Sequence, residues 1–182
     1  MTISTHIPTL EDVARTASVS TATVSRCLNT PDKVAEATRK KVFEAVEGLG
    51  YSPNFGARIM AAKRTYTIGA IIPTMENAIF ARGLQAFQQE LRVHGYQLLV
   101  ASSSYDAKTE AEQIRSLIAR GAEGLLLIGQ DRSAETIGFL KRRDLATLVA
   151  WTFDKEGAFP SVGFDNRASM RELATKLINL GH

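Results

Sequence analysis

Five side chains along residues 21–29 are either small or able to form hydrogen bonds, and an α-helix would gather them on one side. They are Thr21, Ala22, Ser25, Arg26 and Asn29. Ordinary solvent-facing helices carry Glu, Lys and Gln, whereas short side chains let a helix backbone approach another molecule closely. In the major groove of DNA, such side chains read donors, acceptors and thymine methyl groups at base edges. A simple solvated face is the alternative interpretation, and the composition favours DNA.

Side chains for catalysis or metal binding are sparse. Cys27 is the only cysteine, which excludes an internal disulfide, and its place on the apolar side of the helix predicts a buried packing thiol. The histidines at 6, 94 and 182 lack a partner three or four residues away. No phosphate-binding glycine loop or nucleophile motif follows a predicted strand. The sequence therefore predicts no enzyme activity, no metal site and no cofactor.

Two helices joined by a turn must position the base-reading side chains. The first carries an apolar stripe at helical spacing, made of Leu10, Val13, Ala14 and Ala17. Ser20 is the predicted N-cap of the second, over residues 21–28. The second helix turns three apolar side chains toward the first: Val24, Cys27 and Leu28.

A third helix over residues 37–49 is expected to cover the first two. Its predicted apolar stripe consists of Val42, Phe43, Val46 and Leu49, and Gly50 is its predicted end. The three helices predict a helix-turn-helix domain over residues 8–53. The segment 54–64 that follows is too short, and too weakened by Gly56, to hold a helix unaided, so we expect a partner to order it.

Five short motifs occur in order in this region: Asp12-Val13-Ala14, Val19-Ser20, Thr23-Val24-Ser25-Arg26, Thr38-Arg39 and Tyr51-Ser52-Pro53-Asn54. In type, order and spacing, residues 8–64 resemble the DNA-binding headpiece of the LacI/GalR family of bacterial transcriptional regulators. The resemblance implies a homodimer that binds a palindromic double-stranded operator. It implies DNA contacts from Thr21, Ala22, Thr23, Ser25, Arg26, Asn29, Arg39, Asn54, Ala57 and Met60.

In that family, the segment after the Asn folds into a hinge helix on operator DNA and wedges an apolar side chain, usually Leu, into the minor groove. Met60 stands at that place here. Met supplies the apolar bulk that unstacks a base step, with more flexibility. The resemblance therefore assigns the wedge to Met60.

Charge agrees with a nucleic-acid partner. Residues 1–64 contain nine Lys or Arg and six Asp or Glu, whereas the remainder holds thirteen of each, so the net charge of +3 lies in the predicted DNA-binding part. Residues 39–41 and Lys63-Arg64 are the predicted phosphate contacts. Solvated helix ends are the alternative interpretation for each of these cations.

From Tyr66 onward, short apolar runs alternate with amphipathic segments. Strands are predicted over 66–73, 96–102, 124–129, 148–152 and 161–165, and helices over 79–94, 106–120, 133–143 and 166–180. This alternation predicts an α/β fold with a parallel sheet covered by helices on both faces. Ligands of such sheets bind at the carboxyl ends of the strands.

Residues 65–182 resemble the first part of the periplasmic-binding-protein-like effector core of the same family. The supporting motifs are Asn77 to Phe80, Gly95-Tyr96, Gly124 to Leu127 and the run that ends at Asn166. The resemblance implies a sugar-like small-molecule effector, with Phe80 and Asp165 lining its cleft. Ordinary packing and capping of a strand end are the alternative roles of these two residues. Thr152 stands where the family usually has Asp.

Family chains are nearly twice as long, so the resemblance places a second effector subdomain beyond His182. A truncated reading frame, a partial sequence and a natural half-length protein all fit this ending. No hydrophobic leader or apolar run of about 18 residues is present, which predicts a cytoplasmic protein without a membrane partner. The rival functional interpretation is an α/β small-molecule binding protein or enzyme with an incidental helical N-terminus.

Overall fold

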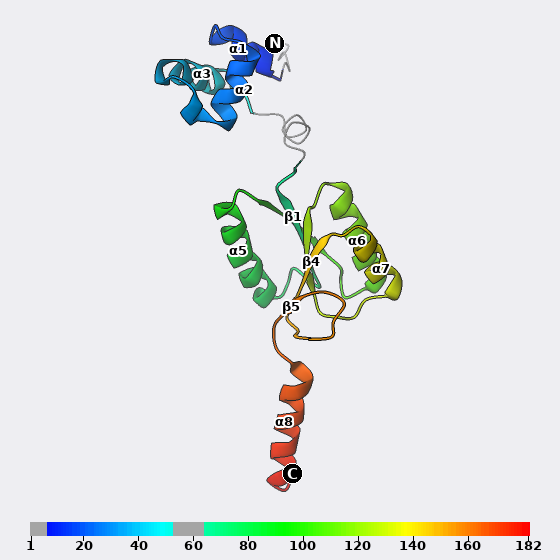
Figure 1. Ribbon diagram of the computed structural model, residues 1–182. Helices are drawn as coiled ribbons and strands as arrows, with labels where there is room; N and C mark the ends of the chain where they lie inside the picture. Colours follow the sequence, from blue (N-terminus) through cyan, green and yellow to red (C-terminus); the bar gives the residue numbers. More distant parts are fainter. Residues whose placement is uncertain (1–6, 53–63) are drawn as a thin grey trace, which may run out of the picture. The chain divides into compact units, whose positions relative to one another are not determined.

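The chain forms two compact units, Met1–Lys63 and Arg64–His182 (Figure 1). The structure is a computed structural model that describes residues 7–52 and 64–182. The first unit is helical in its described part, and the second is an α/β unit.

The helical unit contains α1 (Leu10–Thr16), α2 (Thr21–Asn29), a short 3₁₀ helix η1 (Pro31–Lys33) and α3 (Glu36–Leu49). A capping box begins α1, because the Thr9 hydroxyl accepts from the backbone N–H of Asp12 while the Asp12 carboxylate accepts from that of Thr9 at 2.9 Å. The last helix, α3, ends at Gly50, whose φ of +62° is left-handed and suits a residue without a side chain.

One small core holds the three α-helices together. Its buried members are Val13, Ala14, Ala17, Val24, Cys27, Val42 and Ala45. The predicted stripes of the first two helices and the buried thiol are thereby confirmed. The prediction for Phe43 is wrong, since 42% of this residue is exposed. Positions 42, 45, 46 and 49 repeat at the helical period, and Phe43 lies about 100° further around the helix than position 42.

The α/β unit alternates strands with helices as expected. The strands are β1 (Thr67–Ile72), β2 (Gln97–Ser102), β3 (Gly124–Ile128), β4 (Ala146–Ala150) and β5 (Ser161–Val162). The helices are α5 (Ala78–Val93), α6 (Ala107–Ala119), α7 (Ala134–Arg142) and α8 (Asn166–Asn179).

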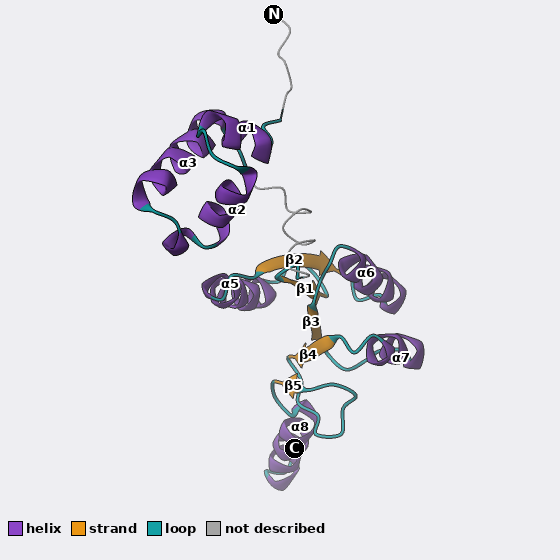
Figure 2. Cartoon of the chain, turned by 45° about the horizontal axis from the view of Figure 1, so that its top comes forward, coloured by secondary structure: helices purple, strands orange, loops and turns teal. Residues whose placement is uncertain are grey.

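The strands form one sheet in the order β2-β1-β3-β4-β5, and every neighbouring pair is parallel. One face of the sheet packs against α5, and α6 and α7 cover the other (Figure 2). The larger core lies on the α6 and α7 side around Ile71, Ile114, Leu127 and Leu140. The predicted parallel α/β fold is confirmed, and the carboxyl ends of its strands share one edge.

The last two strands differ from their predicted ranges. Residues 146–150 form β4, two residues earlier than predicted, because Thr147 is buried with its hydroxyl donating to the Leu145 carbonyl at 2.9 Å. Trp151 leaves the strand with a φ of +65°. The predicted strand 161–165 shortens to Ser161–Val162, since the chain at Gly163 passes so close to Thr152 that a Cβ would lie 2.4 Å from its nitrogen.

The final helix, α8, contributes no buried residue and extends beyond β5 (Figure 1). Its exposed apolar side chains include Met170, Leu173, Leu177 and Ile178. Among the helices within residues 7–52 and 64–182, none combines the length and hydropathy needed to cross a lipid bilayer.

Replacing Leu127, which is fully buried under α6 and α7, tests where the core lies. We expect Leu127→Ala to lower the free energy of unfolding of the α/β unit by about 3 kcal/mol, because the lost side chain leaves a cavity. Urea unfolding followed by the fluorescence of Trp151, the only tryptophan, measures this unit. Leu173→Ala, on the exposed α8, is the matched control with a change under about 0.5 kcal/mol. Equal losses in the two variants would contradict the placement of the core.

Candidate nucleic-acid interface

The outward side of α2 carries the side chains that the sequence assigns to base recognition. Ser25 is half-buried, and the exposed members of this face are Thr21, Ala22, Arg26 and Asn29. The opposite side is held by Val24 and Cys27, which are fully buried in the helical core. The rotation of α2 about its own axis is thereby fixed.

Ser20 starts this helix as the sequence predicts. Its Oγ accepts from the backbone N–H of Thr23 at 3.2 Å and lies 2.9 Å from the Thr23 hydroxyl oxygen. An amide that the helix itself leaves unpaired is therefore satisfied. Thr23 is half-buried, so its side chain helps to fix the first turn of α2.

The amide of Asn29 lies along the last turn of α2. Its Nδ2 donates to the Ser25 carbonyl at 2.9 Å and to the Ser25 hydroxyl at 3.3 Å. These bonds use the amide nitrogen and orient the side chain, while the amide oxygen makes no hydrogen bond within the described residues. The Asn29 oxygen can therefore accept from a partner.

Two arginines of the helical unit carry charges that are available to DNA. The Arg26 side chain forms no hydrogen bond or ion pair with the residues described in ranges 7–52 and 64–182. Arg39 lies 4.0 Å from Asp32, measured from Nη1 to Oδ1. A contact this long between solvent-accessible groups stabilises little, so either guanidinium can turn to a phosphate.

Arg64 differs from these two arginines, because it is paired within the α/β unit. Its Nη2 lies 2.8 Å from the Glu123 Oε2 of the α/β unit. The first unit, residues 1–63, consequently holds eight basic and six acidic residues, a smaller surplus than the sequence division at residue 64 gave. A phosphate contact by Arg64 stays a prediction, and it would require Arg64 to leave this pair.

The structure places the two predicted effector residues at the carboxyl edge of the sheet in different settings. Phe80, in the first turn of α5, is buried edge-on against Trp151 with ring centroids 5.5 Å apart. Asp165 is exposed and caps α8, since its Oδ1 accepts from the Ala168 N–H at 2.8 Å. The neighbouring Asn166 donates to the Trp151 carbonyl at 3.4 Å. Phe80 is therefore packed, as its alternative role predicts, whereas Asp165 caps the helix that follows the strand.

The structure also shows a buried ion pair at the same edge, which the sequence analysis does not predict. The Arg132 side chain is 3% exposed, and its Nε lies 2.7 Å from the Glu110 Oε1. Burial lowers the pKa of Arg132 and raises the pKa of Glu110, while their mutual attraction opposes both shifts. The one sequence feature that points to this pair is the position of Arg132 shortly after β3. No group of three or more His, Cys, Asp or Glu side chains is placed to hold a metal ion within the described part of the chain.

Two family models together match nearly all of the chain. Residues 9–54 match the bacterial regulatory proteins of the lacI family, and residues 65–182 match the periplasmic binding proteins and sugar binding domain of the LacI family. The chain belongs to the LacI family.

Individual relatives agree. The LacI-family chain is 35% identical to the HTH-type transcriptional regulator RegA of Clostridium saccharobutylicum, over 94% of this chain and 52% of that protein. Catabolite control protein A of Priestia megaterium is 32% identical over 96% of this chain and 52% of its own. A LacI-family regulator crystal structure from Silicibacter pomeroyi superposes with a TM-score of 0.83 at 28% identity, covering 96% of this chain and 53% of that one. The chain thus spans about half the length of the curated relatives it matches.

The predicted phosphate contact Lys63 lies outside the described residues, as do three contacts assigned by resemblance. These three are Asn54, Ala57 and Met60. Their roles rest on the sequence resemblance alone, as predictions.

The N-caps of α2 and α3 allow a paired test of how capping stabilises the helices of the interface. Ala35, the N-cap residue of α3, offers no side-chain hydrogen bond, and its backbone, with φ of −55° and ψ of 138°, is non-helical as a cap requires. We expect Ser20→Ala to lower, and Ala35→Ser to raise, the local stability of the helical unit by about 1 kcal/mol each. Amide hydrogen exchange of α2 and α3 in the full chain measures both. Unchanged protection of α2 in Ser20→Ala would contradict the cap.

Proposed function

We propose that this chain is the DNA-binding part and first effector-binding part of a transcription regulator, in which α2 reads operator DNA in the major groove. The observation that carries the proposal is the outward face of α2, which exposes Thr21, Ala22, Arg26 and Asn29 while the opposite side is buried in the core. A helix presented in this way can bring its backbone close to base edges.

The proposed contacts divide by chemistry. Arg26 and Asn29 offer hydrogen bonds to bases, and Thr21, Ala22 and Ser25 allow close approach. Thr23 and Arg39 face the backbone phosphates. The minor-groove contacts assigned by resemblance are Asn54, Ala57 and the wedge Met60.

A homodimer presents two copies of α2 related by a two-fold axis, so the operator is a palindrome. Its half-sites lie one helical turn, about 34–36 Å, or a multiple of it apart. The dimer acts as a repressor by occupying the operator, in the cytoplasm where the chromosome lies.

The α/β unit senses a sugar-like metabolite at the carboxyl edge of its sheet. The chain carries Trp151 and the edge-on Phe80 there, and aromatic rings offer an apolar surface to a sugar ring. Asp165 supplies a carboxylate at the same edge. The rival assignment to an enzyme is not favoured, since the Clostridium and Silicibacter relatives described above are named as transcriptional regulators.

Binding to a palindrome selected by the wild-type chain from random DNA tests the regulator. We expect affinity to fall steeply with salt, because phosphate contacts release counterions. Arg26→Ala should weaken binding by about 1–3 kcal/mol and relax the base preference, because a base contact is lost. Arg92→Ala, an exposed arginine in the last turn of α5, is the control with unchanged affinity. If the wild type shows no preference over random DNA at any salt concentration, the assignment fails.

Trp151 provides an intrinsic probe of the effector edge, because it is the only tryptophan and contacts Phe80. Titration with glucose, ribose and gluconate covers neutral sugars and a sugar acid. We expect at least one to shift or quench the fluorescence saturably, and Phe80→Leu to weaken that response. A spectrum unaffected by all three at millimolar concentration would argue against a sugar-like effector.

A further inference from the structure

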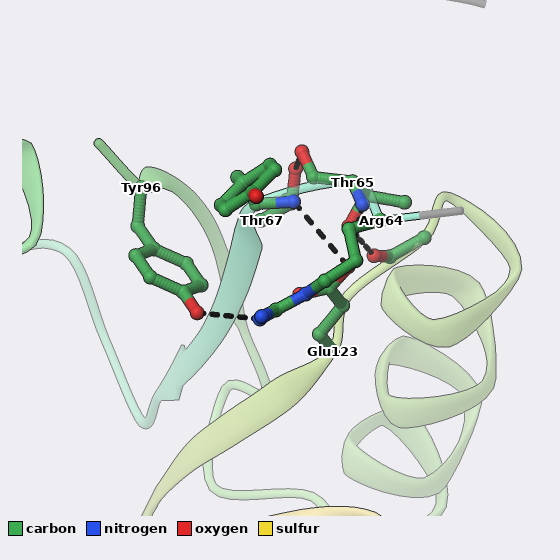
Figure 3. A network of polar contacts seen from close by, with 7 residues as sticks. Arg64, Thr65, Thr67, Tyr96 and Glu123 are labelled. Carbon is green, nitrogen blue, oxygen red and sulfur yellow. Dashed lines mark hydrogen bonds and ion pairs between the residues drawn. The ribbon is translucent and has the colours of Figure 1, made fainter. Parts of the chain in front are cut away.

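Arg64, the first described residue after the segment that joins the two units, is bound on several sides (Figure 3). Its Nη2 and Nε donate to the Glu123 Oε2 at 2.8 and 3.2 Å. The same Nη2 donates to the Tyr96 hydroxyl at 2.5 Å. Its guanidinium carbon lies 4.9 Å from the centre of the Tyr66 ring and 5.8 Å from that of Tyr96. The cation therefore has both a charged partner and aromatic partners.

The Glu123 carboxylate also holds the backbone that follows Arg64. Its Oε1 accepts from the Thr65 N–H at 2.5 Å and from the Tyr66 N–H at 3.4 Å. The Thr65 hydroxyl donates to the Gly121 carbonyl at 2.5 Å. One carboxylate thus binds three consecutive residues of the incoming chain. We call Arg64, Tyr96 and Glu123, with the backbone of residues 65 and 66, the entry clamp.

The entry clamp lies at the amino ends of three adjacent strands. Residues 64–66 precede β1, Tyr96 precedes β2 and Glu123 precedes β3. Further backbone bonds continue the sheet here, from Gln97 N to the Tyr66 carbonyl and from Glu123 N to the Thr67 carbonyl, both 2.8 Å. The clamp is therefore built on three hydrogen-bonded strands, at the edge opposite to Phe80 and Trp151.

Both charges of the clamp are mutually stabilised. Glu123 raises the pKa of Arg64 through hydrogen bonding and charge attraction, and the Arg64 hydrogen bond lowers the pKa of Glu123. Near neutral pH both groups are ionised, so the pair persists where the protein works.

We propose that Arg64 is a positioning residue, which with Glu123 fixes the point where the chain from the DNA-binding unit joins the α/β unit. The proposal rests on the function proposed above. Without the clamp, the connecting chain would gain residues 64–66, and each DNA-binding unit would sample a larger volume. A second unit would then meet its half-site at a lower effective concentration after the first has bound. Arg64 thus acts on paired binding without touching DNA.

The two roles of Arg64, phosphate contact and clamp, predict opposite changes in DNA affinity for Glu123→Ala. If Arg64 bound phosphate, Glu123→Ala would remove a competing acid and strengthen DNA binding. If Arg64 belongs to the clamp, Glu123→Ala weakens binding to the palindrome and leaves a single half-site unaffected. Glu123→Gln, which keeps the size and the acceptor oxygen of the side chain, separates loss of the charge pair from loss of folding.

We expect Arg64→Ala and Glu123→Ala each to weaken palindrome binding about twofold, because three added residues lengthen the connecting chain only slightly, while half-site affinity stays unchanged. The double variant should be no weaker than either single one. Arg115→Ala is the matched control, because Arg115 forms a comparable 2.9 Å pair with Glu135 away from the connecting chain. Equal weakening on both DNAs, or stronger binding by Glu123→Ala, would overturn the proposal.

Trypsin cleavage after Arg64 tests the clamp without DNA. We expect Glu123→Ala and Glu123→Gln to accelerate it about tenfold, because the site opens locally more often, while Glu135→Ala changes nothing. Thermal unfolding of the α/β unit checks that the variants fold. If cleavage accelerates but no chain prefers an operator, the clamp stands and the proposed function falls. Unchanged cleavage in the folded Glu123 variants refutes the clamp.

Discussion

The burial of one side of α2 is the constraint on which the proposed DNA-reading surface depends. Val24 and Cys27 are fully buried between α1 and α3, so every other position of α2 has a determined direction. Rolling the helix would expose these apolar groups and bring Arg26 toward the core, where an unpaired charge is costly. Both penalties oppose the same motion. The outward position of Arg26 follows from packing, and the Ser20 cap fixes where the helix starts.

Four arginines illustrate how tertiary surroundings assign different roles to one side chain. Arg26 is unpaired within the described residues, and Arg39 has only a distant acid. Arg64 is bound by a carboxylate and two rings at the start of the sheet. Arg132 is buried against Glu110 at its opposite edge. Cations that remain solvated can exchange water for phosphate at little cost, whereas a paired cation must first lose its partner.

Because all its strands are parallel, the sheet places the attachment of the connecting chain and the proposed effector site at opposite edges. All strands begin at the edge that receives the connecting chain and end at the edge that holds Phe80 and Trp151. The strands β1 and β3 run between these edges, and their register is set by a continuous ladder. The two edges are therefore the opposite ends of the same pair of hydrogen-bonded strands.

The sequence by itself determined the local elements and the surface of α2. Helical spacing identified the stripe of α1, the buried side of α2 and the cap at Ser20, because these features depend on residues within one or two turns. Alternating apolar runs predicted the parallel α/β fold. Phe43 and the bounds of β4 differ from the sequence prediction, because an apolar side chain beside the helical stripe stays exposed and the Thr147 hydroxyl is satisfied by a nearby carbonyl.

Only the tertiary structure decided the partners of the charged and aromatic side chains. Arg64 meets Glu123 across 59 positions of sequence, and Arg132 meets Glu110 across 22. Trp151 meets Phe80 because β4 ends beside the start of α5. No local pattern encodes such pairs, because they form where separate strands of a sheet are brought together, and the sequence spacing of two residues does not set their distance after folding.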